Sequence, residues 1–373
     1  MKRYNNLYEK ICSFENLYLA YLKARECKRY KSEILKFSYH LENNLLNLRK
    51  ELLDQNYKHG SYRTFIVNDS KKRIIKAAPF RDRVVHHALC NLIEPIFDRG
   101  FIYDSYACRK NKGTHKTIKR LESFIRSISD HIKNKAIPED VYCLQCDISK
   151  YFANIDHEIL IKLIEKKVKD KKTLWLISKI VESSYKCKFL ENLLEFRLVG
   201  IPIGNLTSQL FANIYLNELD QFIKHKLHKK YYLRYMDDFI ILNNNKKELH
   251  QARALIQDFL KNKLKLKFHP KKANIFLAKR GINFLGYIIF KNYKLLRKST
   301  VKRFIKRVKI LKKKINKKLI TGERYNRSIQ SWLAYAKFGN SWRLRKNLAQ
   351  NYQIINSLLK SNSNKQAKIC KIL

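Results

Sequence analysis

The sequence predicts an α+β fold in which helices cover a sheet. Strand-like apolar runs lie at Val141 to Asp147 and at Leu233 to Leu242, and helical segments lie between them at Leu160 to Val168 and at Leu206 to Lys226. Strands interleaved with helices favour a layered fold with one sheet face covered. Hydrophobic residues make up 45% of the 373 residues, which is enough to form a folded core.

The N-terminal third predicts helices around a basic hairpin. Leucines recur at helical spacing from Leu41 to Leu52, which indicates an amphipathic helix. A basic segment from Tyr62 to Lys76 is hairpin-like, with its turn signal at Asn68, Asp69 and Ser70. Helical apolar spacing then returns between Arg81 and Ile96.

The C-terminal part changes character beyond about Lys294. One helical face is apolar, and the remaining faces carry lysines and arginines with almost no acidic residues between them. The apolar stripe is Val301, Phe304, Ile305, Val308 and Ile315. This pattern predicts a separate helical domain with a phosphate-facing surface. The polar stretch that follows predicts a flexible tail at 361–373.

The charge of the chain indicates a polyanionic partner. Lys and Arg number 80 against 31 Asp and Glu, a formal net charge of +49. Neutralising nucleic-acid phosphates releases condensed counterions, so nucleic acid is the first expected partner and an anionic membrane surface the second. No uninterrupted apolar run is long enough to span a membrane.

The eight cysteines and the N-terminal sequence together favour the cytoplasm. The cysteines lack the spacing of a disulfide scaffold, and the N-terminus lacks a cleavable apolar core. Cys143 and Cys146 have the spacing of a metal pair. We favour a strand here, since no second pair follows and residues three apart on a strand point to opposite faces.

Three acidic residues stand at the ends of the apolar runs. Asp237 and Asp238 are adjacent in a turn-like position, and Asp147 ends the first run. If the two segments pair, their carboxylates converge and their repulsion requires a positive partner. Such a cluster can hold two Mg²⁺ ions about 4 Å apart, the arrangement used in nucleotidyl transfer. Taken singly, Asp147 could instead cap the next helix, and the other two could form a surface turn.

A Gly/Pro loop leads into a helix between Gly200 and Asn217. Its backbone N–H groups can face a phosphate or a templating base, and Gly204 permits close backbone approach. With this third element the chain resembles a bacterial reverse transcriptase. The segment from Asp147 to Phe152 is similar to the first catalytic motif of that family, the Gly200 loop to its second, and Tyr235 to Asp238 to its third.

This resemblance implies a right-hand polymerase with fingers, a palm whose antiparallel sheet carries the acids, and a helical thumb. The expected domains are 1–140 for the N-terminal helices, the fingers and the first palm helix, 141–292 for the palm with inserted fingers helices, and 293–360 for the basic thumb. Only about thirty residues remain after the thumb motifs, so we expect no further maturase or endonuclease domain.

The resemblance also implies the site residues. The catalytic residues would be Asp147, Asp237 and Asp238, and these with Ile148 would hold two Mg²⁺ ions, with Mn²⁺ as a substitute. The residues expected to bind the nucleotide are Arg73, Arg81, Phe152, Ile203, Gly204, Gln209 and Lys272. The primer grip would be Phe284, Leu285 and Gly286. Phe152 would act as a steric gate against ribonucleotides. Lys272 would protonate pyrophosphate, although Lys271 is adjacent and Ala273 replaces the usual Thr.

One departure indicates a subgroup. Ile203 stands where most reverse transcriptases have Gln, and Ser208 is followed by Gln209 in place of Pro. This variant resembles reverse transcriptases of diversity-generating retroelements, related to those of group II introns and retrons, which copy a template RNA with errors and use a small basic accessory protein. Ile203 cannot make the hydrogen bond of Gln, so looser base-pair control is expected.

Several alternatives remain open at this stage. A defence-associated antiphage enzyme that copies its own noncoding RNA could share these motifs. A second reverse transcriptase could be the protein partner in place of a small basic accessory protein. An RNA-dependent RNA polymerase shares the palm. A third alternative is a nonenzymatic RNA scaffold that has lost catalysis. The three acidic residues speak against it, because such a protein has no reason to hold three like charges together. The expected partners are template RNA, a cDNA primer–template and deoxynucleoside triphosphates, in a bacterial or phage-encoded cytoplasmic protein.

Overall fold

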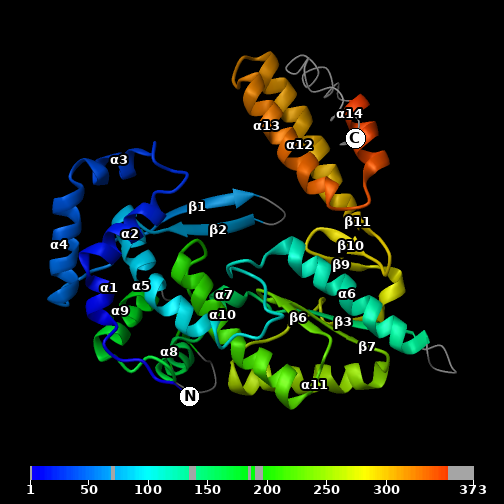
Figure 1. The fold of residues 1–373 in the computed structure, drawn as a ribbon, viewed down its shortest axis with the longest axis horizontal. Helices are drawn as coiled ribbons and strands as arrows, with labels where there is room; N and C mark the ends of the chain where they lie inside the picture. The colour runs from blue at the N-terminus through cyan, green and yellow to red at the C-terminus, as the bar shows by residue number, and fades with distance from the viewer. Residues whose placement is uncertain (1, 69–71, 134–139, 184–185, 190–195, 352–373) are drawn as a thin grey trace. The chain divides into compact units, whose positions relative to one another are not determined.

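The computed structural model describes residues 2–68, 72–133, 140–183, 186–189 and 196–351 (Figure 1). It divides into two compact units. The first unit is Met1–Gly113, Leu144–Ile241 and Lys247–Asn274, and the second is Thr114–Cys143, Leu242–Lys246 and Ile275–Leu373. The predicted α+β class is confirmed, because both units combine helices with antiparallel strand pairs.

The first unit begins with four helices and a hairpin. These elements are α1 (Tyr8–Cys12), α2 (Phe14–Ala24), α3 (Ser32–Tyr39), α4 (Leu41–Leu53), β1 (Arg63–Asn68) and β2 (Lys72–Ala77). The amphipathic helix predicted from the leucine spacing is α4, where Leu45, Leu48 and Leu52 are fully buried. The predicted hairpin is also confirmed, since β1 pairs antiparallel with β2. Its predicted turn residues Asp69 and Ser70 lie outside the described residues.

Helix α5 (Phe80–Asp98) forms the centre of this unit. Val84, Val85, Ala88, Leu89 and Ile93 are fully buried in it. The helix packs against α2 and against α10 (Leu206–Gln221), as Figure 1 shows. Burial on several faces explains why its apolar residues do not form a single narrow stripe.

The remaining elements of the first unit are strands of a sheet, a separate two-stranded hairpin and several helices. They are β3 (Tyr142–Asp147), α7 (Tyr151–Asn154), α8 (His157–Glu165), α9 (Lys171–Glu182), β4 (Lys186–Phe189), β5 (Phe196–Val199), the π-helix η1 (Phe222–Lys226), β6 (Tyr232–Tyr235), β7 (Asp238–Asn243) and α11 (Lys246–Lys263). In the sheet, β7 lies between β6 and β3. The strand interpretation of Cys143 and Cys146 is confirmed, and both are buried in β3.

Helix α8 begins earlier and ends earlier than the spacing from Leu160 to Val168 predicts. Its N-terminus is set by Asp156, whose side chain accepts a hydrogen bond from the Ile159 backbone N–H at 3.0 Å. Val168 lies outside the helix because it forms a parallel bridge with Tyr4.

The second unit consists of one long helix, small strands and the C-terminal helices. They are α6 (Thr114–Lys133), β8 (Asn274–Leu277), the 3₁₀ turn η2 (Ala278–Arg280), β9 (Ile282–Phe284), β10 (Tyr287–Ile289), β11 (Lys294–Leu296), α12 (Lys298–Asn316), α13 (Gly322–Lys337) and α14 (Trp342–Asn351). The predicted apolar stripe lies in α12, where Phe304 stacks on Trp332 with ring centroids 3.8 Å apart. The predicted tail, 361–373, lies outside the described residues.

The division into fingers, palm and thumb at 1–140, 141–292 and 293–360 stays a prediction. None of the helices in the described parts of the chain offers the length of apolar sequence that a bilayer crossing requires.

Candidate functional site

Two of the three predicted catalytic acids lie at the ends of neighbouring strands, and the third lies in the turn before one of them. Asp147 is the last residue of β3, Asp238 is the first residue of β7, and these strands are adjacent in the sheet. Tyr235 pairs directly with Asp238 across the β6–β7 hairpin, so Met236 and Asp237 form a two-residue turn. Asp147 is buried, with 7% exposure, whereas Asp237 and Asp238 are half-buried.

The loop that carries Lys272 is fixed against the end of β3. The His269 backbone N–H donates to the Asp147 carbonyl at 2.8 Å, and the Lys272 N–H donates to the His269 carbonyl at 3.0 Å. The Lys272 ammonium contacts the Asp147 carboxylate as an ion pair. The structure therefore brings together Asp147 and Lys272, and it places Lys272 rather than Lys271 beside the acid.

These contacts correct one alternative from the sequence. Asp147 does not cap the following helix, because α7 begins after Lys150 and the Asp147 side chain faces Lys272. Between the end of β3 and the start of α7, the chain turns through Lys150, which has a positive φ of 46°. Lys150, and not Asp147, is therefore the residue that precedes the helix.

The acids offer carboxylate oxygens, the donors that Mg²⁺ favours. Within the described ranges, no three His, Cys, Asp or Glu side chains are grouped closely enough to hold a metal ion. The Asp147 carboxylate nevertheless accommodates a cation, the Lys272 ammonium. The donor chemistry fits a hard divalent cation, and the assembled three-carboxylate cluster stays a prediction.

The second motif lies beside the first through backbone hydrogen bonds. The Ile201 N–H donates to the Phe152 carbonyl at 2.9 Å, and the Gly200 N–H donates to the Ile155 carbonyl at 2.8 Å. These bonds bring the predicted gate residue next to the Gly200 loop. Phe152 is half-buried, so its ring is not a fully enclosed core side chain.

The β1–β2 hairpin is tied to the same loop. The Lys76 N–H donates to the Ile203 carbonyl at 3.1 Å. A Cβ atom on Gly204 would lie 3.1 Å from both the Ile75 Cγ2 and the Lys76 carbonyl oxygen, so this close approach requires glycine. The Ile203 side chain is 38% exposed, and Gln209 is half-buried in the first turns of α10.

The two arginines predicted to contact the nucleotide have different surroundings. Arg73 is exposed on β2, opposite Val67. Arg81 forms an ion pair with Glu51, and its guanidinium lies 5.3 Å from the centre of the Tyr57 ring. Binding a triphosphate through Arg81 would therefore require it to exchange or share its bond to Glu51.

The predicted primer grip lies in the second unit. Phe284 and Tyr287 pair directly across the β9–β10 hairpin, so Leu285 and Gly286 form its turn. Both turn residues have positive φ values, 49° and 91°. Phe284 is buried, and Gly286 faces the hydroxyl of Tyr335, where a Cβ would collide. The turn therefore lies close against α13.

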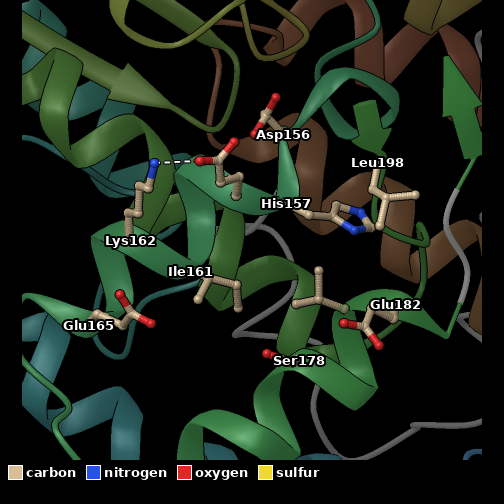
Figure 2. Close-up of a pocket in the computed structure, with 10 residues that line it drawn as sticks. Asp156, His157, Ile161, Lys162, Glu165, Ser178, Glu182 and Leu198 are labelled. Carbon is tan, nitrogen blue, oxygen red and sulfur yellow. Dashed lines mark hydrogen bonds and ion pairs between the residues drawn. The ribbon is translucent and has the colours of Figure 1, made fainter. Parts of the chain in front are cut away.

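A separate cavity of about 470 Å³ lies between α8 and α9 (Figure 2). Its wall contains the ion pair of Lys162 with Glu158, and His157 Nε2 donates to the Gly200 carbonyl at 2.8 Å. A carbonyl can only accept, so this nitrogen is the protonated one. None of the site residues predicted from the sequence lines this cavity.

The sequence interpretation missed two buried charged residues next to the acids, Arg234 and Asp220. Their side chains form an ion pair at 2.6 Å and both are 0% exposed. The available signal was an arginine inside the apolar run from Leu233 to Leu242, where a charge must be paired to be buried.

Comparisons with known proteins identify the family to which this chain is similar. A family profile described as reverse transcriptase (RNA-dependent DNA polymerase) matches residues 58–289. Protein YkfC of Escherichia coli (strain K12) is 25% identical over 278 residues, covering 64% of this chain and 69% of that protein. The group II intron-encoded protein LtrA of Lactococcus lactis subsp. cremoris is 28% identical over 323 residues, covering 67% of this chain and 50% of that protein. The chain thus spans about half the length of LtrA.

Among solved structures, telomerase from Candida albicans, in complex with a fragment of telomeric RNA, aligns with a TM-score of 0.51. The alignment covers 86% of this chain and 59% of that chain at 11% identity. Likeness at this identity concerns the fold alone, and it confirms the predicted right-hand polymerase fold.

Proposed function

The chain belongs to the reverse transcriptase (RNA-dependent DNA polymerase) family, and on this premise we propose that it copies an RNA template into DNA. The observation that carries the proposal is the placement of Asp147 and Asp238 at the ends of adjacent strands, with Asp237 in the turn between β6 and β7. The expected substrates are deoxynucleoside triphosphates and a primer annealed to template RNA.

Asp147, Asp237, Asp238 and the Ile148 carbonyl would hold two Mg²⁺ ions, or Mn²⁺ as a substitute. When bound, such ions lower the pKa of the attacking hydroxyl and stabilise negative charge on the leaving pyrophosphate. The backbone that carries these ligands is held in place, because β3 and β7 belong to one sheet and Ile148 is buried.

Lys272 is the proposed proton donor to pyrophosphate. Its ammonium already lies at the Asp147 carboxylate, so a small rotation of a flexible side chain would bring it to a phosphate bound next to that acid. The loop from His269 to Lys272 is fixed by backbone hydrogen bonds, which limits where the ammonium can reach.

Phe152 and the Gly200 loop would select the nucleotide. The half-buried Phe152 ring would meet a ribose 2′-hydroxyl, and the bond from the Ile201 N–H to the Phe152 carbonyl fixes the Phe152 backbone beside the loop. The exposed, apolar Ile203 offers no hydrogen bond to a base pair. On this basis we propose an error-prone enzyme of a diversity-generating retroelement, working with a small basic accessory protein.

The test is primer extension by purified protein with Mg²⁺ and deoxynucleotides, on matched RNA and DNA templates. The wild type should extend the primer on RNA, whereas the Asp237→Asn/Asp238→Asn double variant should not. Asp258→Asn, which changes an exposed acid on α11, is the control and should extend as the wild type does. Incorporation that survives the double substitution would refute the assignment of the acids.

The subgroup is tested by sequencing the products and the nucleic acid that copurifies with the protein. Misincorporation concentrated opposite adenine, and reduced by Ile203→Gln, supports the retroelement assignment. Faithful copying of one copurifying noncoding RNA would instead indicate the antiphage alternative.

A further inference from the structure

A fully buried ion pair lies directly beneath the turn that presents Asp237 and Asp238. Arg234 donates from Nε to one carboxylate oxygen of Asp220 at 2.7 Å and from a terminal nitrogen to the other at 2.6 Å. Tyr232 donates its hydroxyl to the same carboxylate at 2.6 Å. A pair with this bidentate geometry, 0% exposed on both sides, is highly directional.

The remaining guanidinium hydrogens are also used. One terminal nitrogen donates to the Asn213 side-chain oxygen at 3.2 Å and to the Met236 carbonyl at 3.0 Å. The other donates to the Ser105 hydroxyl at 3.1 Å in addition to Asp220. Arg234 therefore makes a bond with each of its five N–H groups, and its side chain has one available orientation.

The Arg234 guanidinium stays protonated in this buried position. Burial alone would lower its pKa, but the Asp220 carboxylate and its hydrogen bonds outweigh burial and raise the pKa of Arg234. Its backbone is fixed as well, since its N–H donates to the Asp104 carbonyl at 2.9 Å and its carbonyl accepts from the Tyr106 N–H at 3.0 Å.

The contact with Met236 links this network to the acids. Met236 has a φ of +57°, while Asp237 is outside the positive-φ region. A two-residue hairpin turn with this sign pattern normally has glycine at its first position, so methionine is strained there. Such strain persists only where the surroundings hold the backbone, and the bond from Arg234 to the Met236 carbonyl is a direct restraint on the peptide that precedes Asp237.

We propose that Arg234, fixed by Asp220, is a positioning residue that holds the Met236–Asp237 turn in the conformation required for metal-dependent nucleotidyl transfer. This inference rests on the proposed polymerase function. It assigns the buried pair a role in orienting Asp237 and Asp238 in addition to its contribution to stability.

The experiment must separate orientation from folding. Removing only one partner would leave a buried charge unpaired and could unfold the protein, so the main variant replaces both, Asp220→Asn with Arg234→Met. Four quantities are measured: the melting temperature, the affinity for primer–template without divalent ions, the kcat with the half-saturating Mg²⁺ concentration, and the shift in melting temperature caused by Mn²⁺.

We expect the double variant to fold and to bind primer–template as the wild type does. Its kcat should fall roughly ten- to a hundredfold, the loss expected for one hydrogen bond to a charged group. The half-saturating Mg²⁺ concentration should rise, and the stabilisation by Mn²⁺ should shrink. Arg234→Lys keeps the charge but cannot bond both Asp220 and Met236 in this geometry, so it should show the same changes and serves if the double variant does not fold.

The matched control removes a different buried ion pair, Lys294 with Glu122, whose side chains are 15% and 10% exposed. Glu122→Gln with Lys294→Met should change the melting temperature but not the Mg²⁺ requirement. The inference is overturned if a folded Arg234 variant keeps the wild-type kcat and Mg²⁺ requirement, or if activity falls only in proportion to the folded fraction. A wild type that makes no DNA would instead refute the proposed function.

Discussion

Replacing Gly204 with alanine tests whether the nucleotide pocket depends on contact between the Gly200 loop and the β1–β2 hairpin. Gly204 has a φ of +126°, a conformation that residues with a Cβ rarely adopt. An added Cβ would lie 3.1 Å from the Lys76 carbonyl oxygen, a backbone atom. That atom cannot move away easily, because the Lys76 N–H is bonded to the Ile203 carbonyl.

The Gly204→Ala substitution costs free energy in two ways. Backbone strain at such a φ contributes about 1 to 3 kcal/mol. The close contact adds a displacement of the hairpin, and if this displacement costs about 1 to 2 kcal/mol of nucleotide binding, the KM for deoxynucleotides rises roughly five- to thirtyfold. The backbone strain lowers the melting temperature, whereas the displacement of the hairpin raises the KM for deoxynucleotides.

Gly113 provides a control that separates these two costs. Its φ is +110°, but nothing lies within 4 Å of the position that its Cβ would take. Gly113→Ala should therefore lower the melting temperature through strain and leave the KM unchanged. Thermal unfolding and single-nucleotide incorporation on an RNA template measure both quantities for the two variants. If Gly204→Ala raises the KM no more than Gly113→Ala does, the hairpin contact is not part of the nucleotide site.

Three further predictions concern the gate, the proton donor and the stability of the first unit. Phe152→Val should raise ribonucleotide incorporation relative to deoxynucleotide incorporation by roughly tenfold or more, measured by competition; an unchanged sugar preference would remove the gate role. Lys272→Gln should lower kcat by about a hundredfold, while Lys271→Gln, its neighbour control, should not. Burial, with smaller effects of His59, His87 and Arg83, lowers the pKa of His86 from 6.5 to about 3. Below pH 6.5 the unfolded state therefore takes up a proton that the folded state does not, so the free energy of unfolding decreases as the pH is lowered, by roughly 2 to 3 kcal/mol at pH 4.5. Chemical denaturation at pH 7 and pH 4.5 should show this loss in the wild type and a smaller loss in His86→Leu.

Local pattern predicted most of the secondary structure around the site. The strand that ends at Asp147, the hairpin around Asp237 and the helix that begins at Leu206 all follow from short-range apolar spacing and turn chemistry. These features depend on neighbours in sequence, so a single chain reveals them. The leucine spacing of α4 predicted its buried face for the same reason.

The contacts that assemble the site could not be predicted in this way. The pairing of Lys272 with Asp147 joins residues 125 positions apart, and the Lys76 bond to Ile203 depends on how a hairpin meets a distant loop. Arg234 was missed because charged residues are seldom fully buried, so an arginine in a strand is expected to face solvent. Only the fold reveals that Asp220 is present to pair with it.

Several acidic residues of this cationic chain are buried and stabilise the fold. Buried Asp82 accepts from the Tyr57 hydroxyl and the Gly60 N–H at 2.7 and 3.0 Å, Asp156 begins α8, and Asp220 pairs with Arg234. The basic face of α12, by contrast, is exposed. Salt screens exposed charges far more than buried ones. Raising the salt concentration should therefore weaken nucleic-acid binding steeply while the buried pairs that hold the acids in place persist, so loss of activity at high salt should be restored by more primer–template and not by more Mg²⁺.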